Sequence, residues 1–139
     1  ADEGDSGTFA DRMIMEGDPF TLIEGMTIAG AAVGATQGYI YLRSEYPVAA
    51  RVLNAALADA RRTGALGADV RGSGKAFDIE VFIGAGAYIC GEETSLLNSL
   101  EGKRGEVRSR RSSRRVPLSI AITAWANRPA PCRSRSPAM

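Results

Sequence analysis

The chain has 139 residues, 45% of them hydrophobic, which is enough for one modest domain with its own core. It contains no histidine, which excludes His-based catalysis and His metal ligands in this sequence, and its two cysteines are too few for a disulfide framework. The net charge of +1 conceals an asymmetry: residues 1–102 hold seven basic and fifteen acidic residues, whereas residues 103–139 hold ten basic residues and one acidic residue.

The first residues are acidic and glycine-rich. Residues 1–12 lack hydrophobic periodicity, so we interpret them as a loop. They also lack an initiator Met and the features of a signal peptide, which suggests a fragment of a longer, cytoplasmic chain. No apolar run approaches the roughly 20 residues that span a bilayer, and we expect no direct membrane insertion.

Asp18 and Pro19 predict the start of a helix, because aspartate caps helix N-termini and proline fits the first turn. Gly34 is expected to end this helix, since glycine readily adopts the left-handed conformation found there. The predicted buried face consists of residues at helical spacing: Phe20, Ile23, Met26 and Val33.

Residues 38–43 are rich in β-forming side chains and predict a strand. A second helix is expected from residues 45–47 to Gly64, followed by a polar, glycine-rich loop over residues 64–76. One face of this helix is predicted to carry Val48, Val52, Ala55 and Ala56, widened by Leu53, Leu57 and Ala60.

Residues 78–83 alternate and then become fully apolar, which is typical of a strand entering a covered sheet. The glycine turn, residues 84–94, joins this strand to a helix predicted over residues 92–101. Strands that alternate with helices favour an α/β fold with a largely parallel sheet, here a Rossmann-like, three-layer βαβ fragment.

From residue 109 the composition changes. Residues 109–139 are basic and of low complexity, and we interpret them as an irregular tail that is either disordered or the product of a frame shift. Arginine runs can bind nucleic acid by neutralising phosphates, but this tail has a single Trp and no interleaved aromatic residues. We therefore expect no nucleic-acid binding.

The glycine turn has the composition of a cofactor site, because glycines between a strand and a helix let the backbone approach a ligand. Glu92 and Glu93 oppose a phosphate at the helix start, so a ligand is expected to offer hydroxyls and N–H donors. Purely structural roles remain open for these residues. Glu92 and Glu93 can be first-turn acids that favour the helix dipole, and Tyr88 and Cys90 can be core residues. The acids of the first segment can belong to an ordinary solvated loop: Asp2, Glu3 and Asp5.

Two stretches resemble the flavin-site segments of the NADH-oxidising flavoprotein family. They are Ala1-Asp2-Glu3-Gly4-Asp5-Ser6-Gly7-Thr8-Phe9-Ala10-Asp11-Arg12 and Gly84-Ala85-Gly86-Ala87-Tyr88-Ile89-Cys90-Gly91-Glu92-Glu93-Thr94, with further matches at residues 22–26, 38–41 and 99–105. The family includes the flavoprotein subunit of complex I, the diaphorase of NAD-reducing hydrogenases and the beta subunit of NAD-dependent formate dehydrogenases. The resemblance implies that residues 1–108 are a partial Rossmann-like domain for FMN and NAD(H).

Carried over residue by residue, the resemblance implies seven cofactor contacts: Asp2 and Glu3 beside the flavin, Asp5 near the flavin ring and nicotinamide, Tyr88, Gly91 and Glu92 in the flavin pocket, and Glu93 at the NAD ribose and nicotinamide. A carboxylate at Glu93 repels a 2′-phosphate and so favours NAD over NADP. No protein nucleophile or general base is expected, because hydride transfer is the cofactors' own reaction.

The amino-acid sequence of residues 4–19 most resembles formate dehydrogenase members of the family, since complex I members more often have Glu-Pro where this chain has Asp5-Ser6. We therefore predict a formate dehydrogenase beta-type fragment that transfers hydride between NAD(H) and FMN. A complex I or NAD-reducing hydrogenase subunit is the alternative, and an inert, polyanion-binding fragment is a further one.

The resemblance also implies partners and cofactors outside this sequence. Electrons are expected to pass to iron–sulfur clusters, with a small [2Fe–2S] subunit and a catalytic alpha subunit as partners. The family's FMN-phosphate segment and the cysteines for its [4Fe–4S] cluster are absent from this sequence. We therefore predict that the isolated fragment binds FMN weakly and is inactive.

Overall fold

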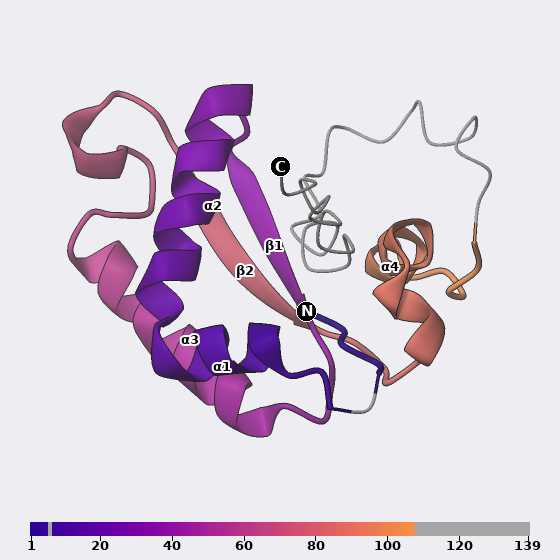
Figure 1. Cartoon of the computed structure of the whole chain (residues 1–139). Coiled ribbons are helices and arrows are strands. Elements are labelled where there is room, and N and C mark those ends of the chain that lie inside the picture. Colours follow the sequence, from indigo (N-terminus) through magenta and orange to yellow (C-terminus); the bar gives the residue numbers. More distant parts are fainter. Residues whose placement is uncertain (6, 108–139) are drawn as a thin grey trace, which may run out of the picture.

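The computed structural model describes residues 1–5 and 7–107, so the predicted basic tail lies outside the described residues. The elements follow one another as α1 (Ala10–Gly17), α2 (Pro19–Val33), β1 (Gln37–Leu42), α3 (Pro47–Arg62), β2 (Asp78–Ile83) and α4 (Glu93–Leu100). Two short 3₁₀ turns, η1 (Val70–Gly72) and η2 (Tyr88–Gly91), precede and follow β2 (Figure 1).

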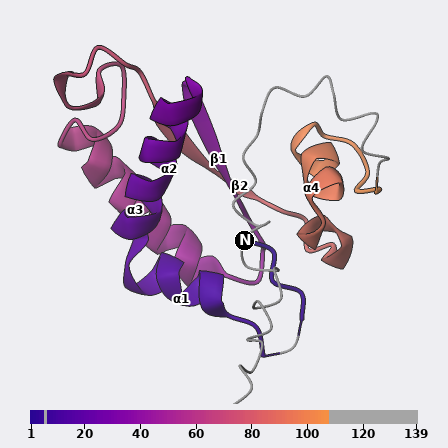
Figure 2. The same ribbon diagram turned by 45° about the horizontal axis from the view of Figure 1, so that its top comes forward.

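The strands β1 and β2 pair in parallel, with α3 in the connection between them, which confirms the predicted α/β fold and its βαβ unit. Their register runs from Gln37 opposite Asp78 to Leu42 opposite Ile83. Figures 1 and 2 show α1, α2 and α3 gathered on one side of the strands and α4 beyond their carboxyl ends on the other side.

Successive strand residues point to opposite faces of the sheet, and each face has its own core. Ile40, Leu42 and Ile79 join the larger core with α1, α2 and α3. On the other face the rings of Tyr41 and Phe82 stack with their centroids 5.5 Å apart, and both belong to a smaller cluster with α4. Within the described residues, the third layer of the predicted fold is therefore η2 and α4.

The strand β2 is less covered than its apolar sequence predicts. Ile79 is fully buried, but Val81 and Phe82 are only partly buried and Ile83 is 49% exposed. Phe82 lies on the face that meets η2 and α4, whereas Val81 and Ile83 share the face of Ile79, where burial decreases towards the carboxyl end of the strand.

The predicted boundaries of α2 are confirmed. The Asp18 carboxylate accepts hydrogen bonds from the Thr21 backbone N–H at 3.2 Å and the Thr21 hydroxyl at 2.6 Å, and Gly34 ends the helix with φ of 72°. The predicted buried face is correct at Ile23 and Met26. It is wrong at two positions at its edges, where the structure leaves the side chains exposed: Phe20 and Val33.

The helix α3 begins at Pro47 as predicted, but its buried face is shifted. Ala49, Leu53, Ala56, Leu57 and Ala60 are buried, whereas Val48 and Ala55 are exposed and Val52 is partly buried. Leu53, Leu57 and Ala60, which were expected only to widen the buried face, thus form its centre. The small alanines allow α3 to approach its neighbours closely, and packing against α1 and α2 selects this face over the one with more valines.

The helix α1 was not predicted, because residues 1–12 read as a loop. Its N-cap residue, Phe9, supplies no side-chain hydrogen bond. The carboxylate of Glu3 caps the helix instead, because it accepts hydrogen bonds from the backbone N–H of Asp11 at 3.0 Å and of Arg12 at 3.4 Å. Met15, 1% exposed, anchors the helix in the larger core. A cap from a residue outside the helix leaves no local sequence signal.

Residues 64–76 form the predicted loop, which contains η1 and one isolated bridge between Gly67 and Phe77. Among the residues that the structure describes, no helix combines the length and apolar character needed to cross a membrane.

Candidate functional site

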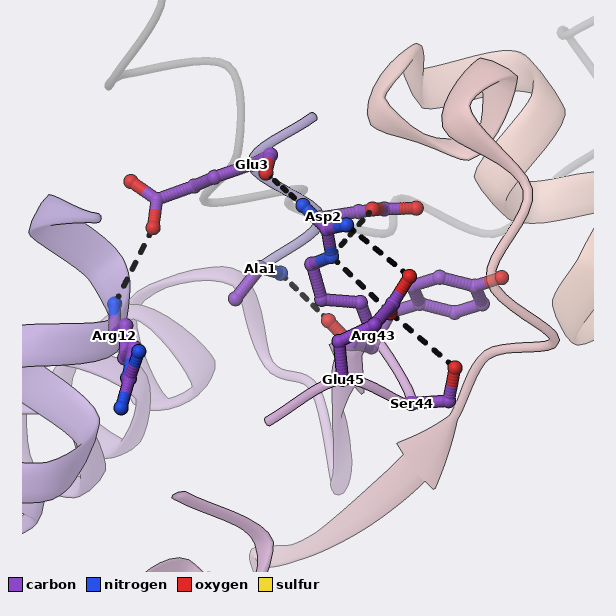
Figure 3. A network of polar contacts seen from close by, with 8 residues as sticks. Ala1, Asp2, Glu3, Arg12, Arg43, Ser44 and Glu45 are labelled. Atoms are coloured by element: carbon purple, nitrogen blue, oxygen red, sulfur yellow. Dashed lines mark hydrogen bonds and ion pairs between the residues drawn. The ribbon is translucent and has the colours of Figure 1, made fainter. Parts of the chain in front are cut away.

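The acidic segment, residues 1–5, lies against the carboxyl end of β1. The amino group of Ala1 donates to the Tyr41 carbonyl at 2.6 Å, and the Arg43 backbone N–H donates to the Ala1 carbonyl at 3.3 Å. Figure 3 shows the segment passing over this end of the strand. Ligands of parallel α/β sheets bind at this edge, so the segment lies where the fold favours a site.

Asp2 is held inside this arrangement. Its side chain is 4% exposed, and its Oδ1 lies 3.8 Å from the Nε of Arg43. Burial raises the pKa of Asp2, while the charge of Arg43 opposes that rise. The interpretation of Asp2 as part of a solvated loop is therefore wrong.

Glu3 is occupied with the N-terminus of α1, as described above, and its backbone carbonyl accepts a hydrogen bond from Arg43 Nη1. Burial raises the pKa of the neighbouring Asp11, and the charge of Glu3 raises it further. In this structure Glu3 fixes the helix that follows the acidic segment.

Asp5 meets Tyr88 across 83 positions of sequence. The Tyr88 hydroxyl donates to Asp5 Oδ1 at 2.8 Å, and the Tyr88 ring lies so close to Gly4 that a Cβ there would overlap it. The hydrogen bond with Asp5 and the charge of Asp5 raise the pKa of Tyr88. Tyr88 is 69% exposed, so the alternative of a core residue is wrong.

Gly91 makes the second contact between the two segments. A Cβ at this position would lie 3.0 Å from the carbonyl oxygen of Asp2, which is tighter than an ordinary contact. Glycine therefore permits the acidic segment and the glycine turn to lie against each other here. The two segments that the sequence singled out are adjacent in the fold.

Glu92 caps α4. Its Oε2 accepts from the Thr94 backbone N–H at 3.0 Å, the Thr94 hydroxyl at 2.6 Å and the Ser95 backbone N–H at 2.9 Å. Burial raises the pKa of Glu92, but the hydrogen bonds from Thr94 and Ser95 outweigh it and lower the pKa overall. Glu92 thus occupies the donors that a phosphate at this helix end would need.

Glu93 is the first residue of α4 and is exposed. A carboxylate in the first turn favours the helix dipole, as the structural alternative expects. The same position leaves Glu93 accessible to a ligand, directly after the residues that contact the acidic segment.

Arg43 is the residue of this site that the sequence analysis missed. Its Nε and Nη2 donate to the two carboxylate oxygens of Glu45 at 3.2 and 3.1 Å. Side-chain hydrogen bonds from Arg43 hold the pKa of Glu45 at about 2. Its guanidinium also lies 5.4 Å from the ring centroid of Tyr46. The available signal was its position, directly after a parallel strand.

A second contact ties α4 to the sheet. The Tyr41 hydroxyl and Ser99 Oγ are 3.0 Å apart, and burial raises the pKa of Tyr41 to about 12. Cys90 is 2% exposed in the same cluster, which confirms its interpretation as a core residue. In residues 1–5 and 7–107, no group of three or more Cys, Asp or Glu could hold a metal ion.

The chain matches the family model described as the Nuo51 FMN-binding domain over residues 1–124, and it belongs to this family of flavoprotein domains. The match runs past residue 108, the expected end of the domain. At the level of the family, the predicted cofactors FMN and NAD are confirmed, because the model describes FMN-binding domains and relatives are NADH-quinone oxidoreductase subunits.

Three curated relatives show how much is shared. The NADP-reducing hydrogenase subunit HndC of Solidesulfovibrio fructosivorans is 56% identical over 106 residues, covering 76% of this chain and 21% of that protein. An NADH-quinone oxidoreductase subunit of Aquifex aeolicus is 54% identical over 110 residues, covering 78% of this chain and 25% of the relative. The corresponding subunit of Escherichia coli is 51% identical over 125 residues, covering 90% and 27%.

A solved structure agrees with the fold. An NAD⁺-reducing [NiFe]-hydrogenase in the H₂-reduced state aligns with a TM-score of 0.66 and 42% identity, over 79% of this chain and 18% of that chain. Across these four proteins, the chain spans between 18% and 27% of the relative's length.

Proposed function

We propose that this chain forms part of the flavoprotein subunit of an NAD(H)-linked oxidoreductase, with the acidic segment and the glycine turn as two sides of one site for FMN and NAD(H). The observation that carries the proposal is the contact between the two segments, made by Tyr88 on Asp5 and by Gly91 on the Asp2 carbonyl. Family membership supplies the identity of the ligands.

The residues present fit the polar parts of these cofactors. Flavin ring N–H groups, ribityl and ribose hydroxyls and the nicotinamide carboxamide are donors, and carboxylates accept from them. Asp5 and Glu93 are exposed acceptors in the proposed site. Glu92 uses Oε2 for all three hydrogen bonds at α4, so its Oε1 can accept from a ligand.

The chemistry of such a site belongs to the cofactors, which exchange a hydride between nicotinamide and flavin. The protein's part is position, because the reacting atoms must approach to about 3–3.5 Å in the correct orientation. Asp2, Glu3, Asp5, Tyr88, Gly91, Glu92 and Glu93 remain our proposed cofactor-binding residues. The structure supports direct contact most for Asp5, Tyr88 and Glu93, and a supporting role for Glu3, which is engaged with α1.

The relatives favour an NADH-quinone oxidoreductase or a hydrogenase as the parent enzyme. A formate dehydrogenase beta subunit is the second candidate, for which Asp5-Ser6 is the specific sequence observation. In either case we expect a cytoplasmic, multi-subunit assembly with a small [2Fe–2S] subunit and electron transfer to iron–sulfur clusters. A gene for a molybdenum-binding alpha subunit beside this one would favour the formate dehydrogenase.

The described residues do not by themselves fit the FMN phosphate, because the N-terminus of α4 is capped by Glu92 and followed by Glu93. We therefore expect the 139-residue chain to bind FMN weakly or not at all. A chimaera provides the full site: in the NADH-quinone oxidoreductase relative of Aquifex aeolicus, the 110 matched residues are replaced by those of this chain, and the protein is assembled in its complex.

The test is FMN content by absorbance and NADH oxidation with ferricyanide as acceptor. We expect the chimaera to hold FMN stoichiometrically and to oxidise NADH, and the isolated chain to do neither. A folded, assembled chimaera without flavin would contradict the proposed function. Tight, stoichiometric FMN in the isolated chain would contradict the expected dependence on further residues.

A further inference from the structure

Arg43 joins two separate pieces of the chain at the carboxyl end of β1, the acidic segment and the residues that directly follow the strand. Its Nε lies 3.8 Å from Asp2 Oδ1, its Nη1 donates to the Glu3 carbonyl, and its Nε and Nη2 donate to the carboxylate of Glu45 (Figure 3). One side chain thus reaches two successive residues of the acidic segment. The guanidinium therefore links the acidic segment to the strand end.

The guanidinium is itself held in place. Glu45 binds it through two hydrogen bonds of 3.1 and 3.2 Å, and the ring centroid of Tyr46 lies 5.4 Å from it. A planar fork gripped on one side in this way presents its other donors in a fixed direction. Lysine at this position would keep the charge but lose the fork.

The acidic segment depends on that link. The Asp2 carboxylate is 4% exposed, and a buried charge that loses its partner is costly. Without Arg43, the Asp2 carboxylate loses the guanidinium beside it, and only the more weakly acting amino group of Ala1 still opposes the rise in its pKa among the positive charges named for Asp2. The Glu3 carbonyl loses its hydrogen bond at the same time, which loosens the backbone of Asp2 and Glu3 between the remaining contacts of Ala1 with β1 and of the Glu3 carboxylate with α1.

A displaced acidic segment changes the glycine turn as well. The Asp2 carbonyl lies directly against Gly91, and Gly4 lies against the ring of Tyr88. In both contacts a backbone group of the acidic segment packs closely against the glycine turn. A shift of residues 2–4 therefore alters the separation of the two segments.

We propose that Arg43 is a positioning residue, which fixes the separation of the acidic segment and the glycine turn and thereby the alignment of the nicotinamide on the flavin. The first part stands on the geometry alone, and the second part rests on the proposed function. Two experiments separate them.

The first experiment measures the separation in the 139-residue chain by NMR. Arg43→Met is expected to lose the nuclear Overhauser contacts between the Tyr88 ring and the α protons of Gly4, while contacts between α3 and β2 persist. The matched control is Arg12→Met: Arg12 also lies over the ring of Tyr46, at 5.6 Å, but its side chain pairs with Glu16 at 3.0 Å rather than with the acidic segment.

Unchanged Tyr88–Gly4 contacts in Arg43→Met, or equal losses in Arg12→Met, would overturn the positioning role. If Arg43→Met does not fold, Arg43→Lys decides in its place, and the proposal then requires weakened Tyr88–Gly4 contacts in a folded chain.

The second experiment measures NADH oxidation per bound flavin in the chimaera. Arg43→Met is expected to lower kcat about 10- to 100-fold with a smaller change in KM, because a misplacement of about 1 Å is enough for such a loss. Arg43→Lys should recover part of it, and Arg12→Met should match the parent.

A merely structural role for Arg43 would reduce the yield of flavin-containing protein and leave turnover per flavin unchanged, and that result would overturn the second part. A parent chimaera that binds no flavin would overturn the proposed function and this second part, whereas the NMR result would still decide the first.

Discussion

Gly91→Ala tests the contact between the acidic segment and the glycine turn directly. The added Cβ would lie 3.0 Å from the Asp2 carbonyl oxygen, so the acidic segment or η2 has to move by a few tenths of an ångström. Gly91 does not have a positive φ, and alanine is therefore compatible with its backbone. The expected cost comes from the contact alone.

Two opposing effects set the size of the change. Overpacking typically costs about 1–3 kcal/mol, whereas alanine in place of glycine gains about 0.4–1 kcal/mol by restricting the unfolded chain. The net destabilisation is expected to be about 1 kcal/mol. For a folded unit of about 100 residues, this lowers Tm by roughly 4–8 °C.

Thermal unfolding followed by circular dichroism measures this shift, with Gly17→Ala as the matched control. An added Cβ at Gly17 would have nothing within 4 Å, so the Tm of the Gly17→Ala variant should equal that of the parent or be slightly higher. NMR contacts between Tyr88 and Gly4 should weaken in Gly91→Ala alone. If Gly91→Ala has the parent's Tm and intact Tyr88–Gly4 contacts, the two segments are not packed as the structure shows.

Three further changes have outcomes that follow from the structure. Gly30→Ala should destabilise the chain by about 1–3 kcal/mol, because its Cβ would lie 2.5 Å from the Phe77 ring. Gly25→Ala, with open space around its Cβ, should stabilise the chain by about 0.5–1 kcal/mol. Thermal denaturation measures both variants, and a change in unfolding free energy of the same sign in both would contradict the packing of α2. Glu92→Gln should cost about 0.5–2 kcal/mol at pH 7. Hydrogen bonding lowers the pKa of Glu92 in the folded chain, so the difference in unfolding free energy between parent and variant should be complete above the ordinary glutamate pKa. It should vanish as the pH falls through the folded-state pKa of Glu92. A difference that does not change with pH would refute the capping role. Glu93→Gln in the chimaera should relax the discrimination against NADPH, and an unchanged ratio of kcat/KM values for NADH and NADPH would remove the role proposed for this carboxylate.

The nucleotide preference is of interest because one relative is an NADP-reducing hydrogenase subunit, whereas others are NADH-quinone oxidoreductase subunits. The exposed carboxylate of Glu93, at the first position of α4, is the candidate that this chain offers for rejecting a 2′-phosphate.

Part of the candidate site could be read from the sequence. The glycine turn and the acids around it stand out by composition, and the family resemblance joined them to the acidic segment. Their individual roles could not be read in the same way. A glutamate at the start of a helix can cap that helix or bind a ligand, and the hydrogen bonds of Glu92 to Thr94 and Ser95 show the first of these.

The sequence by itself determined the features that depend on neighbouring residues. Asp18, Pro19 and Gly34 define the two ends of α2 through local hydrogen bonds and backbone preferences. β-forming side chains predicted β1, and the alternating and then apolar pattern of residues 78–83 predicted β2. These signals act over a few positions and do not need the rest of the molecule. The parallel βαβ arrangement then follows from the order of the elements.

Only the tertiary structure decided what depends on distant partners. The helix α1 forms where Glu3, outside the helix, caps it and Met15 enters the core. The buried face of α3 is chosen by the helices it packs against. Arg43 becomes part of the site because Asp2, 41 positions earlier in the chain, needs a cation beside its buried carboxylate. Long-range contacts carry no periodicity or spacing in the sequence, and they appear only when the chain has folded.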